Sequence, residues 1–309
     1  MKIYDCFTYF DEDLILDARL NIMNNYVDYF VIVEGTYNHN GERRELKFDL
    51  NKYQKFKNKI KYIVWDEVPE NIEKINDDDT EIVREHKFIN NAVKRDNGQR
   101  NYVIKGLDDA EDNDLILLSD LDEIPSLKAI NLKNIKTKII IFDQIMCYYK
   151  FNLAIPNYKW FGTRACLKKD LKSPQWLRNI KARKYPFYRL DILFNEKKFN
   201  NIQLIKNGGW HFTNIKTPEE IHYKYKSYCH HREYELSGMN IEKIKEIIES
   251  KHTIYDLKVD QRTNKIGKGM KLINLKDHEL PDYIVSKKNN LTRQIIFFTY
   301  YVIWEFMIL

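Results

Sequence analysis

The chain has 309 residues, of which 43% are hydrophobic and 31% are charged, and its formal net charge is +6. This composition allows a large core, and ten glycines with seven prolines exclude a collagen-like, linker-rich or low-complexity chain. The basic excess is concentrated between Lys168 and Lys184, a segment that contains a single acid. We expect this segment to be irregular and to be either a solvated loop or a site for an anionic acceptor. Nucleic acid is not favoured as a partner, because no recognised binding motif accompanies these residues.

Strand and helix patterns alternate through the first half of the chain. Apolar runs and 3.6-residue spacing predict, in chain order, strand 3–7, helix 11–25, strand 29–34, strand 59–65, helix 81–107 and strand 115–119. We expect the second helix to break at Gly98. The order of these elements predicts an α/β fold with a mostly parallel, doubly wound central sheet and right-handed crossovers.

The second half begins with a strand pattern at 138–149 and then becomes helical. Thr217, followed by Pro218, predicts a helix start with a capping box, and Asn240 is expected to cap a further helix. We predict a single domain over 1–309, divided into an α/β core at 1–215 and a helical part at 216–309. The apolar tail at 295–309 is shorter than a membrane span. It is expected either to dock on the core or to rest on a membrane surface.

The cysteines and the N-terminus bear on the cellular compartment. Cys6, Cys147, Cys166 and Cys229 lack C-x-x-C spacing, so we expect reduced, buried thiols rather than disulfides or a zinc site. The first residues contain no apolar signal-peptide segment. The expected location is therefore cytoplasmic, with peripheral attachment to the inner face of a membrane as the alternative.

Two aspartates, Asp120 and Asp122, directly follow the strand predicted at 115–119. Ligands bind at the carboxyl ends of strands in open α/β sheets. Two carboxylates at such an edge can hold a divalent cation, and the cation can hold a diphosphate. On an ideal strand, both side chains would point to the same face. The alternative is an ordinary aspartate-rich turn without a ligand.

Three further residues are candidates for the same site. Glu34 ends another predicted strand. Arg100 interrupts the apolar spacing of its helix and either binds a diphosphate or forms a surface ion pair. His211 follows two glycines and is either a metal ligand or a histidine hydrogen-bonded in a packed corner.

Taken together, these motifs resemble glycosyltransferase family 17, the family of bisecting β-1,4-N-acetylglucosaminyltransferases. The matching segments keep the family order from about residue 3 to about residue 260, and they include 27–34, 41–48, 99–101, 114–125 and 209–211. The resemblance implies a GT-A fold, a UDP-sugar donor such as UDP-N-acetylglucosamine, a Mn²⁺ or Mg²⁺ ion and inversion at the anomeric carbon. It also implies a glycan or glycolipid acceptor.

The resemblance also implies roles for individual residues. The expected donor-binding residues are Phe7 near the uracil, Arg19, Glu34, Arg100, Asp120 and Asp122. The expected metal ligands are Asp120, Asp122 and His211. An inverting transfer needs a general base near the acceptor hydroxyl, and Asp143, Asp191 and Glu219 are the alternatives for it.

Two other functions compete with this interpretation. One is a non-catalytic carbohydrate-binding or membrane-scaffold protein that retains the fold. The other is a phosphotransferase of the haloacid dehalogenase type, which also uses D-x-D at a strand end. That enzyme class places the motif after its first strand, with Thr or Val four residues after the first Asp, whereas Ile124 stands there in this chain.

Overall fold

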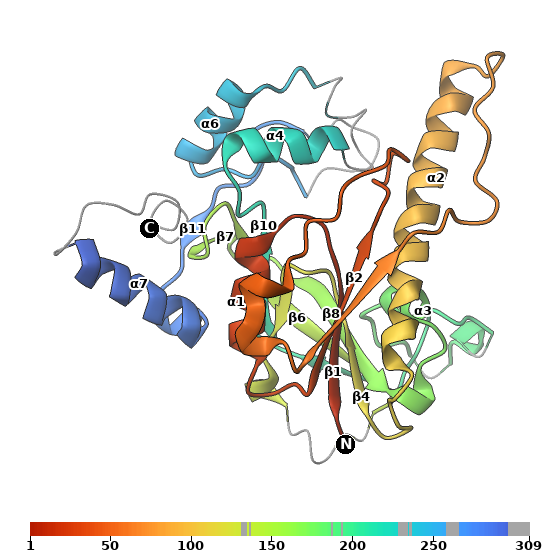
Figure 1. Ribbon diagram of the computed structural model, residues 1–309, viewed down its shortest axis with the longest axis horizontal. Helices are drawn as coiled ribbons and strands as arrows, with labels where there is room; N and C mark the ends of the chain where they lie inside the picture. The colour runs from red at the N-terminus through yellow and green to blue at the C-terminus, as the bar shows by residue number, and fades with distance from the viewer. Residues whose placement is uncertain are drawn as a thin grey trace.

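The computed structural model describes residues 1–130, 135, 137–186, 188–192, 194–227, 234, 237–257 and 266–295. It is a mixed α/β structure in which helices cover both faces of a central sheet (Figure 1). Cys229 and the apolar tail after Ile295 lie outside the described residues. Cys6, Cys147 and Cys166 are free and buried, as the sequence predicted.

The sheet has the strand order β11-β7-β6-β8-β4-β1-β2-β3. In that order the strands span Ile273–Asn274, Leu153–Ala154, Ile139–Tyr148, Trp160–Leu167, Leu115–Leu118, Ile3–Tyr9, Tyr29–Gly35 and Ile60–Trp65. Off this path lie β5 (Glu123–Pro125), β9 (Ile202–Ile205) and β10 (Gly209–Thr213). The expectation of a parallel sheet holds for β4, β1, β2 and β3. The other half is mixed, because β8 runs antiparallel to both β4 and β6.

Helices α1 (Asp13–Met23) and α2 (Glu81–Tyr102) lie on opposite faces of the parallel strands (Figure 1). Side chains of a strand alternate between the faces, so each strand contributes to two cores. In β4, Leu115 and Leu117 join the core that includes α1, whereas Ile116 and Leu118 join the core on the other face. Burial on both faces explains why these strands are uninterrupted apolar runs.

The break expected at Gly98 is wrong, because α2 continues through it to Tyr102. A β-carbon at Gly98 would lie 2.9 Å from Cζ2 of Trp65. The glycine therefore lets the helix approach β3 closely, and its lower helix propensity, about 1 kcal/mol relative to alanine, does not interrupt the helix.

The basic segment is also more ordered than expected. It contains α3 (Pro174–Asn179), where the Ser173 side chain accepts from the amide of Trp176 and Pro174 occupies the first turn. This short helix packs against α2 and β8. It brings one basic side chain, Arg178, to the end of the sheet.

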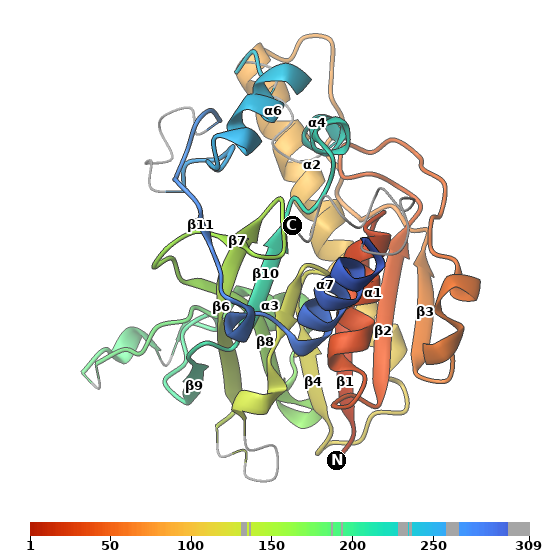
Figure 2. The same ribbon diagram turned by 90° about the vertical axis from the view of Figure 1, so that its left-hand side faces the viewer.

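The C-terminal part contains α4 (Pro218–Ser227), α6 (Ile241–Glu249) and α7 (Asp282–Ile295). Thr217 forms the predicted capping box with Glu220, and Asn240 caps α6 by accepting from the amide of Lys243. Helix α7 lies beside α1 (Figures 1 and 2). The short 3₁₀ helices span Leu50–Phe56, Val103–Leu107, Leu127–Ala129, Lys168–Asp170, Leu190–Ile192 and Asp277–Glu279. Among the helices described, none combines the length and apolarity that crossing a membrane requires.

Candidate functional site

Asp120 and Asp122 lie in the turn between β4 and β5, at the carboxyl end of the parallel strands. The amide of Glu123 donates to the carbonyl of Asp120 at 3.1 Å and closes this turn. On an ideal strand the two carboxylates would point to the same face, but in this turn they do not. Each instead has its own partners.

Asp120 accepts hydrogen bonds from arginines on two helices. Nη2 of Arg100, from α2, lies 3.1 Å from Oδ1, and Nη2 of Arg178, from α3, lies 2.8 Å from Oδ2. Burial alone would raise the pKa of Asp120, but Arg178 and Arg100 hold it well below the usual range. The side chain is still 37% exposed, so a ligand can reach this ionised carboxylate.

Asp122 faces His211, which lies on β10. Oδ2 of Asp122 is 3.3 Å from Nε2 of His211. The imidazole also stacks on Trp160, with ring centroids 4.7 Å apart, and its buried Nδ1 has no hydrogen-bond partner in the described part of the chain. Opposing the effect of burial, the pair lowers the pKa of Asp122 and raises that of His211. The structure thus brings His211 together with the D-x-D turn, and its role as a metal ligand stays a prediction.

Arg19 supports this turn from inside the core. Its guanidinium is fully buried and forms two hydrogen bonds to Asp5, at 2.8 and 2.6 Å. Nη1 donates to three backbone carbonyls of the turn, those of Asp120, Leu121 and Glu123. The sequence predicted that Arg19 contacts the sugar donor directly. This prediction is wrong, because the N–H groups of Arg19 form hydrogen bonds within the protein.

Phe7 and Glu34 also do not lie where they could make the expected contacts with the sugar donor. Phe7 has no exposed surface, and the Arg19 guanidinium lies 4.4 Å from its ring centroid. The fully buried carboxylate of Glu34 accepts from the amides of Lys47 and Phe48 and from the Tyr62 hydroxyl. In this conformation Glu34 holds the loop that contains Lys47 and Phe48, Phe7 packs in the core, and neither side chain presents surface to a ligand.

Two of the three candidates for the general base are exposed and paired with neighbouring cations. Asp191 bonds Arg189 and Lys198, whose hydrogen bonds lower its pKa. Glu219 forms an ion pair with Lys245, and its own backbone amide and Lys245 lower its pKa. A carboxylate with a lowered pKa is a weak proton acceptor, so the structure does not favour either as the base.

Asp143 has the more suitable chemistry. It lies at a β-bulge in β6, where the register against β8 shifts, and bulges can redirect a side chain. Burial raises its pKa, opposed by Lys159 and Lys206. The charges that act on it are these two lysines rather than the D-x-D turn, so its role as the base stays a prediction.

The residues present fit a divalent cation that is shared with a diphosphate. Asp122 and His211 supply a carboxylate oxygen and an imidazole nitrogen side by side, whereas Asp120 is engaged by two arginines. Within the described part of the chain, no group of three or more His, Cys, Asp or Glu side chains could hold a metal ion. Mg²⁺ commonly binds through one or two carboxylates, with phosphates and water completing its shell. The described residues therefore suit a cation that binds together with its nucleotide.

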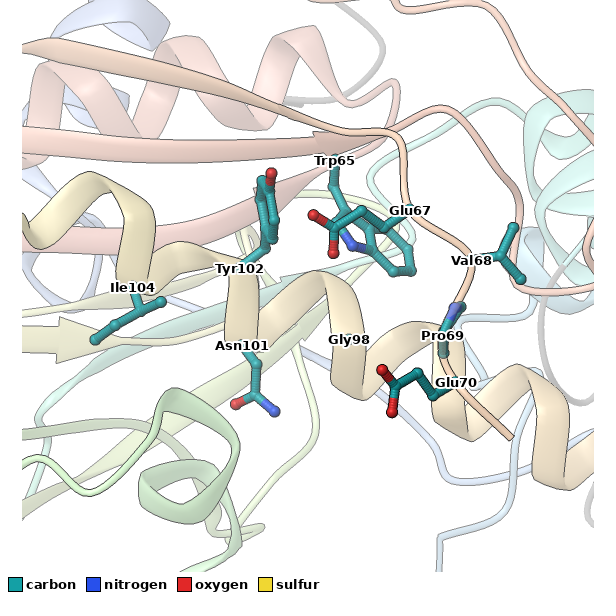
Figure 3. A pocket seen from close by; sticks show the side chains of 9 residues that line it. All are labelled: Trp65, Glu67, Val68, Pro69, Glu70, Gly98, Asn101, Tyr102 and Ile104. Carbon is teal, nitrogen blue, oxygen red and sulfur yellow. The ribbon is translucent and has the colours of Figure 1, made fainter. Parts of the chain in front are cut away.

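A separate pocket of about 600 Å³ lies between α2 and the segment after β3 (Figure 3). Trp65 and Tyr102 line it together with two carboxylates, those of Glu67 and Glu70. None of the residues predicted for the site lines this pocket. Its carboxylates would repel a diphosphate, so it does not suit the phosphate part of a donor.

The Asp122–His211 pair predicts a pH dependence of stability in the metal-free protein. The lowered pKa of Asp122 stabilises the fold above the ordinary Asp pKa, and this contribution is lost as the pH falls through the folded value. The raised pKa of His211 stabilises the fold below the ordinary His pKa, and this contribution is lost as the pH rises through the folded value. The pair therefore contributes fully between about pH 4 and about pH 6.5.

Urea unfolding of the wild type and of His211→Asn checks this expectation. The difference in unfolding free energy should be larger at about pH 5.5 than at about pH 8.5, because the contribution of the raised His211 pKa is complete below about pH 6.5 and declines as the pH rises above it. A difference that is the same at both values would show that the pair carries no net charge interaction.

Two residues of the site were missed by sequence reasoning. Arg178 was only one of several basic residues, although Ser173 and Pro174 signal the start of its helix. Glu123 lies within the matching segment 114–125 and had no predicted role, yet it is fully buried beside the turn. No local pattern shows which side chain a residue will meet more than 50 positions away.

The comparisons with known proteins bear on the competing functions. The D-x-D turn follows β4 rather than the first strand, which argues against a phosphotransferase of the haloacid dehalogenase type. A family model described as Glycosyltransferase family 17 matches residues 1–293, a range that contains every residue of the turn and its partners. No curated protein matches the chain.

Proposed function

This chain belongs to glycosyltransferase family 17 and transfers a sugar from a donor to a glycan acceptor, and from that premise we propose a metal-dependent, inverting enzyme of the GT-A fold that uses a UDP-sugar. UDP-N-acetylglucosamine is the proposed donor. The observation that carries the proposal is the exposed part of the D-x-D turn, where Asp122 faces His211 and Asp120 faces two arginines.

The chain's own residues suit the binding of a diphosphate. Asp122 and His211 would hold Mn²⁺ or Mg²⁺, which when bound withdraws charge from the leaving diphosphate. Arg100 and Arg178 place two guanidinium groups beside the turn, and the buried Nε of Arg100 bonds no residue that the structure describes. Guanidinium groups bind phosphate oxygens with charge-assisted hydrogen bonds. Asp120 keeps both arginines oriented before the donor arrives.

The proton of the acceptor hydroxyl needs an acceptor on the protein. Asp143 is the proposed base among the three candidates, because burial raises its pKa whereas hydrogen bonds lower the pKa values of Asp191 and Glu219. A carboxylate with a raised pKa is the stronger proton acceptor in the transition state.

Thermal unfolding with UDP and Mn²⁺ tests the proposal. We expect UDP to stabilise the protein only when Mn²⁺ is present, by about 2.7 kcal/mol at a ligand concentration of 100 times Kd. EDTA should remove the effect. Equal stabilisation by UDP with Mn²⁺ and with EDTA would contradict the proposed metal dependence.

Hydrolysis of UDP-N-acetylglucosamine without an acceptor tests the chemistry. We expect slow release of UDP that stops on chelation, and less release from UDP-glucose. Transfer to an acceptor should give a product of inverted anomeric configuration, which NMR coupling constants would report. A binding protein without activity would release no UDP under any of these conditions.

A further inference from the structure

Glu123 is the third carboxylate of the sequence Asp120-Leu-Asp-Glu123, and it is fully buried. Its Oε1 accepts from Nε1 of Trp160 at 2.7 Å and from Nη2 of Arg178 at 2.8 Å. Its Oε2 accepts from Nη1 of Arg178 at 2.8 Å and from the amide of Asp120 at 3.1 Å. Each oxygen has two donors, so the carboxylate is saturated by the protein and has no room for a ligand.

Two sets of contacts, which we call arms, extend from Glu123, and the first leads to Asp120. Arg178 binds Glu123 with both terminal nitrogens, and its Nη2 also donates to Oδ2 of Asp120 at 2.8 Å. Burial alone would lower the pKa of Arg178, but the two carboxylates raise it, so the guanidinium stays charged. The planar guanidinium thereby fixes the orientation of Asp120 relative to Glu123.

The other arm leads to His211. The Trp160 indole is held by its Nε1–H on Glu123, and its ring stacks on the imidazole. Nδ1 of His211 has no hydrogen-bond partner among the described residues, whereas a histidine that binds a metal is normally oriented by a bond at its second nitrogen. The stacked indole therefore restrains the imidazole from the face of its ring, while Asp122 contacts its Nε2.

We propose that Glu123 is a positioning residue that sets both halves of the site, Asp120 through Arg178 and His211 through Trp160, without touching a ligand. The inference deepens the proposed function and rests on it. A neighbouring glycine leaves the space that this carboxylate occupies. A β-carbon at Gly162 would lie 2.8 Å from Cδ of Glu123 and 2.1 Å from Oε1 of Gln144, so only glycine leaves the space.

A carboxylate is required because all four partners are donors. In Glu123→Gln, an amide NH₂ would face one nitrogen of the guanidinium and either the indole N–H or the amide of Asp120, and a donor cannot accept from them. At least one bond to Arg178 would be broken while the volume stays the same. We expect a 10- to 100-fold loss in kcat/KM for UDP release from UDP-N-acetylglucosamine, the usual effect of removing a group that orients metal ligands (about 10–100-fold).

Asp114→Asn is the matched control. Asp114 is also a buried carboxylate that accepts backbone amides, but it lies at the opposite end of β4 from the turn. The control should lower the melting temperature and leave kcat/KM and the half-saturating Mn²⁺ concentration unchanged. Glu123→Gln should raise the half-saturating Mn²⁺ concentration as well as lower kcat/KM.

Two further variants separate the arms. Trp160→Phe keeps an aromatic ring over His211 but removes the N–H, and Arg178→Lys keeps the charge but removes the paired geometry. Each should reproduce part of the loss. Because Trp160 acts through Glu123, the double variant Glu123→Gln/Trp160→Phe should lose little more than Glu123→Gln alone.

The inference is overturned if Glu123→Gln, like the control, changes only the melting temperature, or if its effect and that of Trp160→Phe simply multiply. A wild type that releases UDP equally well with EDTA would instead reject the proposed metal dependence. In that case the comparison of kcat/KM between Glu123→Gln and Asp114→Asn still decides the inference.

Discussion

The Asp122→Ala variant is expected to lose on the order of 10²–10³-fold in kcat/KM for UDP release, the loss seen when a group that stabilises developing charge is removed. Asp122, whose side chain is 21% exposed, lies 3.3 Å from Nε2 of His211. Its removal takes away one of the two side chains proposed to hold the cation, and the remaining imidazole cannot replace its negative charge.

Steady-state kinetics at saturating Mn²⁺ and thermal unfolding with UDP measure this effect. We expect the variant to keep its fold and to lose the stabilisation that UDP and Mn²⁺ give together. The exposed Asp112, near the other end of β4, offers the same substitution away from the site, and Asp112→Ala should behave as the wild type. Wild-type kinetics in Asp122→Ala would remove the basis of the proposed function.

The largest effect on stability is expected for Arg19→Met. The variant removes a buried cation whose partner, Asp5, also has no exposed surface. Removing one member of a buried ion pair leaves the other charge without compensation, which costs about 3–5 kcal/mol. The three carbonyls of the turn that accept from Nη1 would lose this donor as well, although those of Asp120 and Glu123 would keep a second one.

Urea unfolding measures this loss, and Asp5→Asn should approach it because it breaks the same pair. Lys172→Ala provides the control, since Lys172 pairs with Glu196 on the surface, where both side chains are more than half exposed. A surface pair of this kind contributes about 0–1 kcal/mol. A loss below about 1 kcal/mol in Arg19→Met would show that the buried pair does not hold the turn.

The loss of activity expected for Asp122→Ala and the loss of stability expected for Arg19→Met follow from how deeply each residue is buried. Asp122 is partly exposed, so its loss should change chemistry more than folding. Arg19 is fully buried beneath the turn, so its loss should destabilise the fold and displace the turn together. If Arg19→Met keeps wild-type kcat/KM per folded molecule, the turn keeps its shape without the three carbonyl bonds.

The sequence by itself determined the elements that depend on neighbouring residues. The strands β1, β2 and β4 were predicted because burial on both faces demands an unbroken apolar run. The caps at Thr217 and Asn240 were predicted because a cap bonds amides two or three positions away. The D-x-D motif likewise marked a strand end, because its carboxylates interrupt the apolar run that burial on both faces requires.

Only the tertiary structure decided which side chains meet at that strand end. Asp120 and Arg178 are 58 positions apart and lie together because α3 packs on β8 and α2. Arg19 has the helical spacing of a core residue, and only its neighbour Asp5 on β1 and the turn above it explain why a charge lies inside. Local periodicity follows from the geometry of one segment, whereas the partner of a charged side chain depends on how distant segments pack.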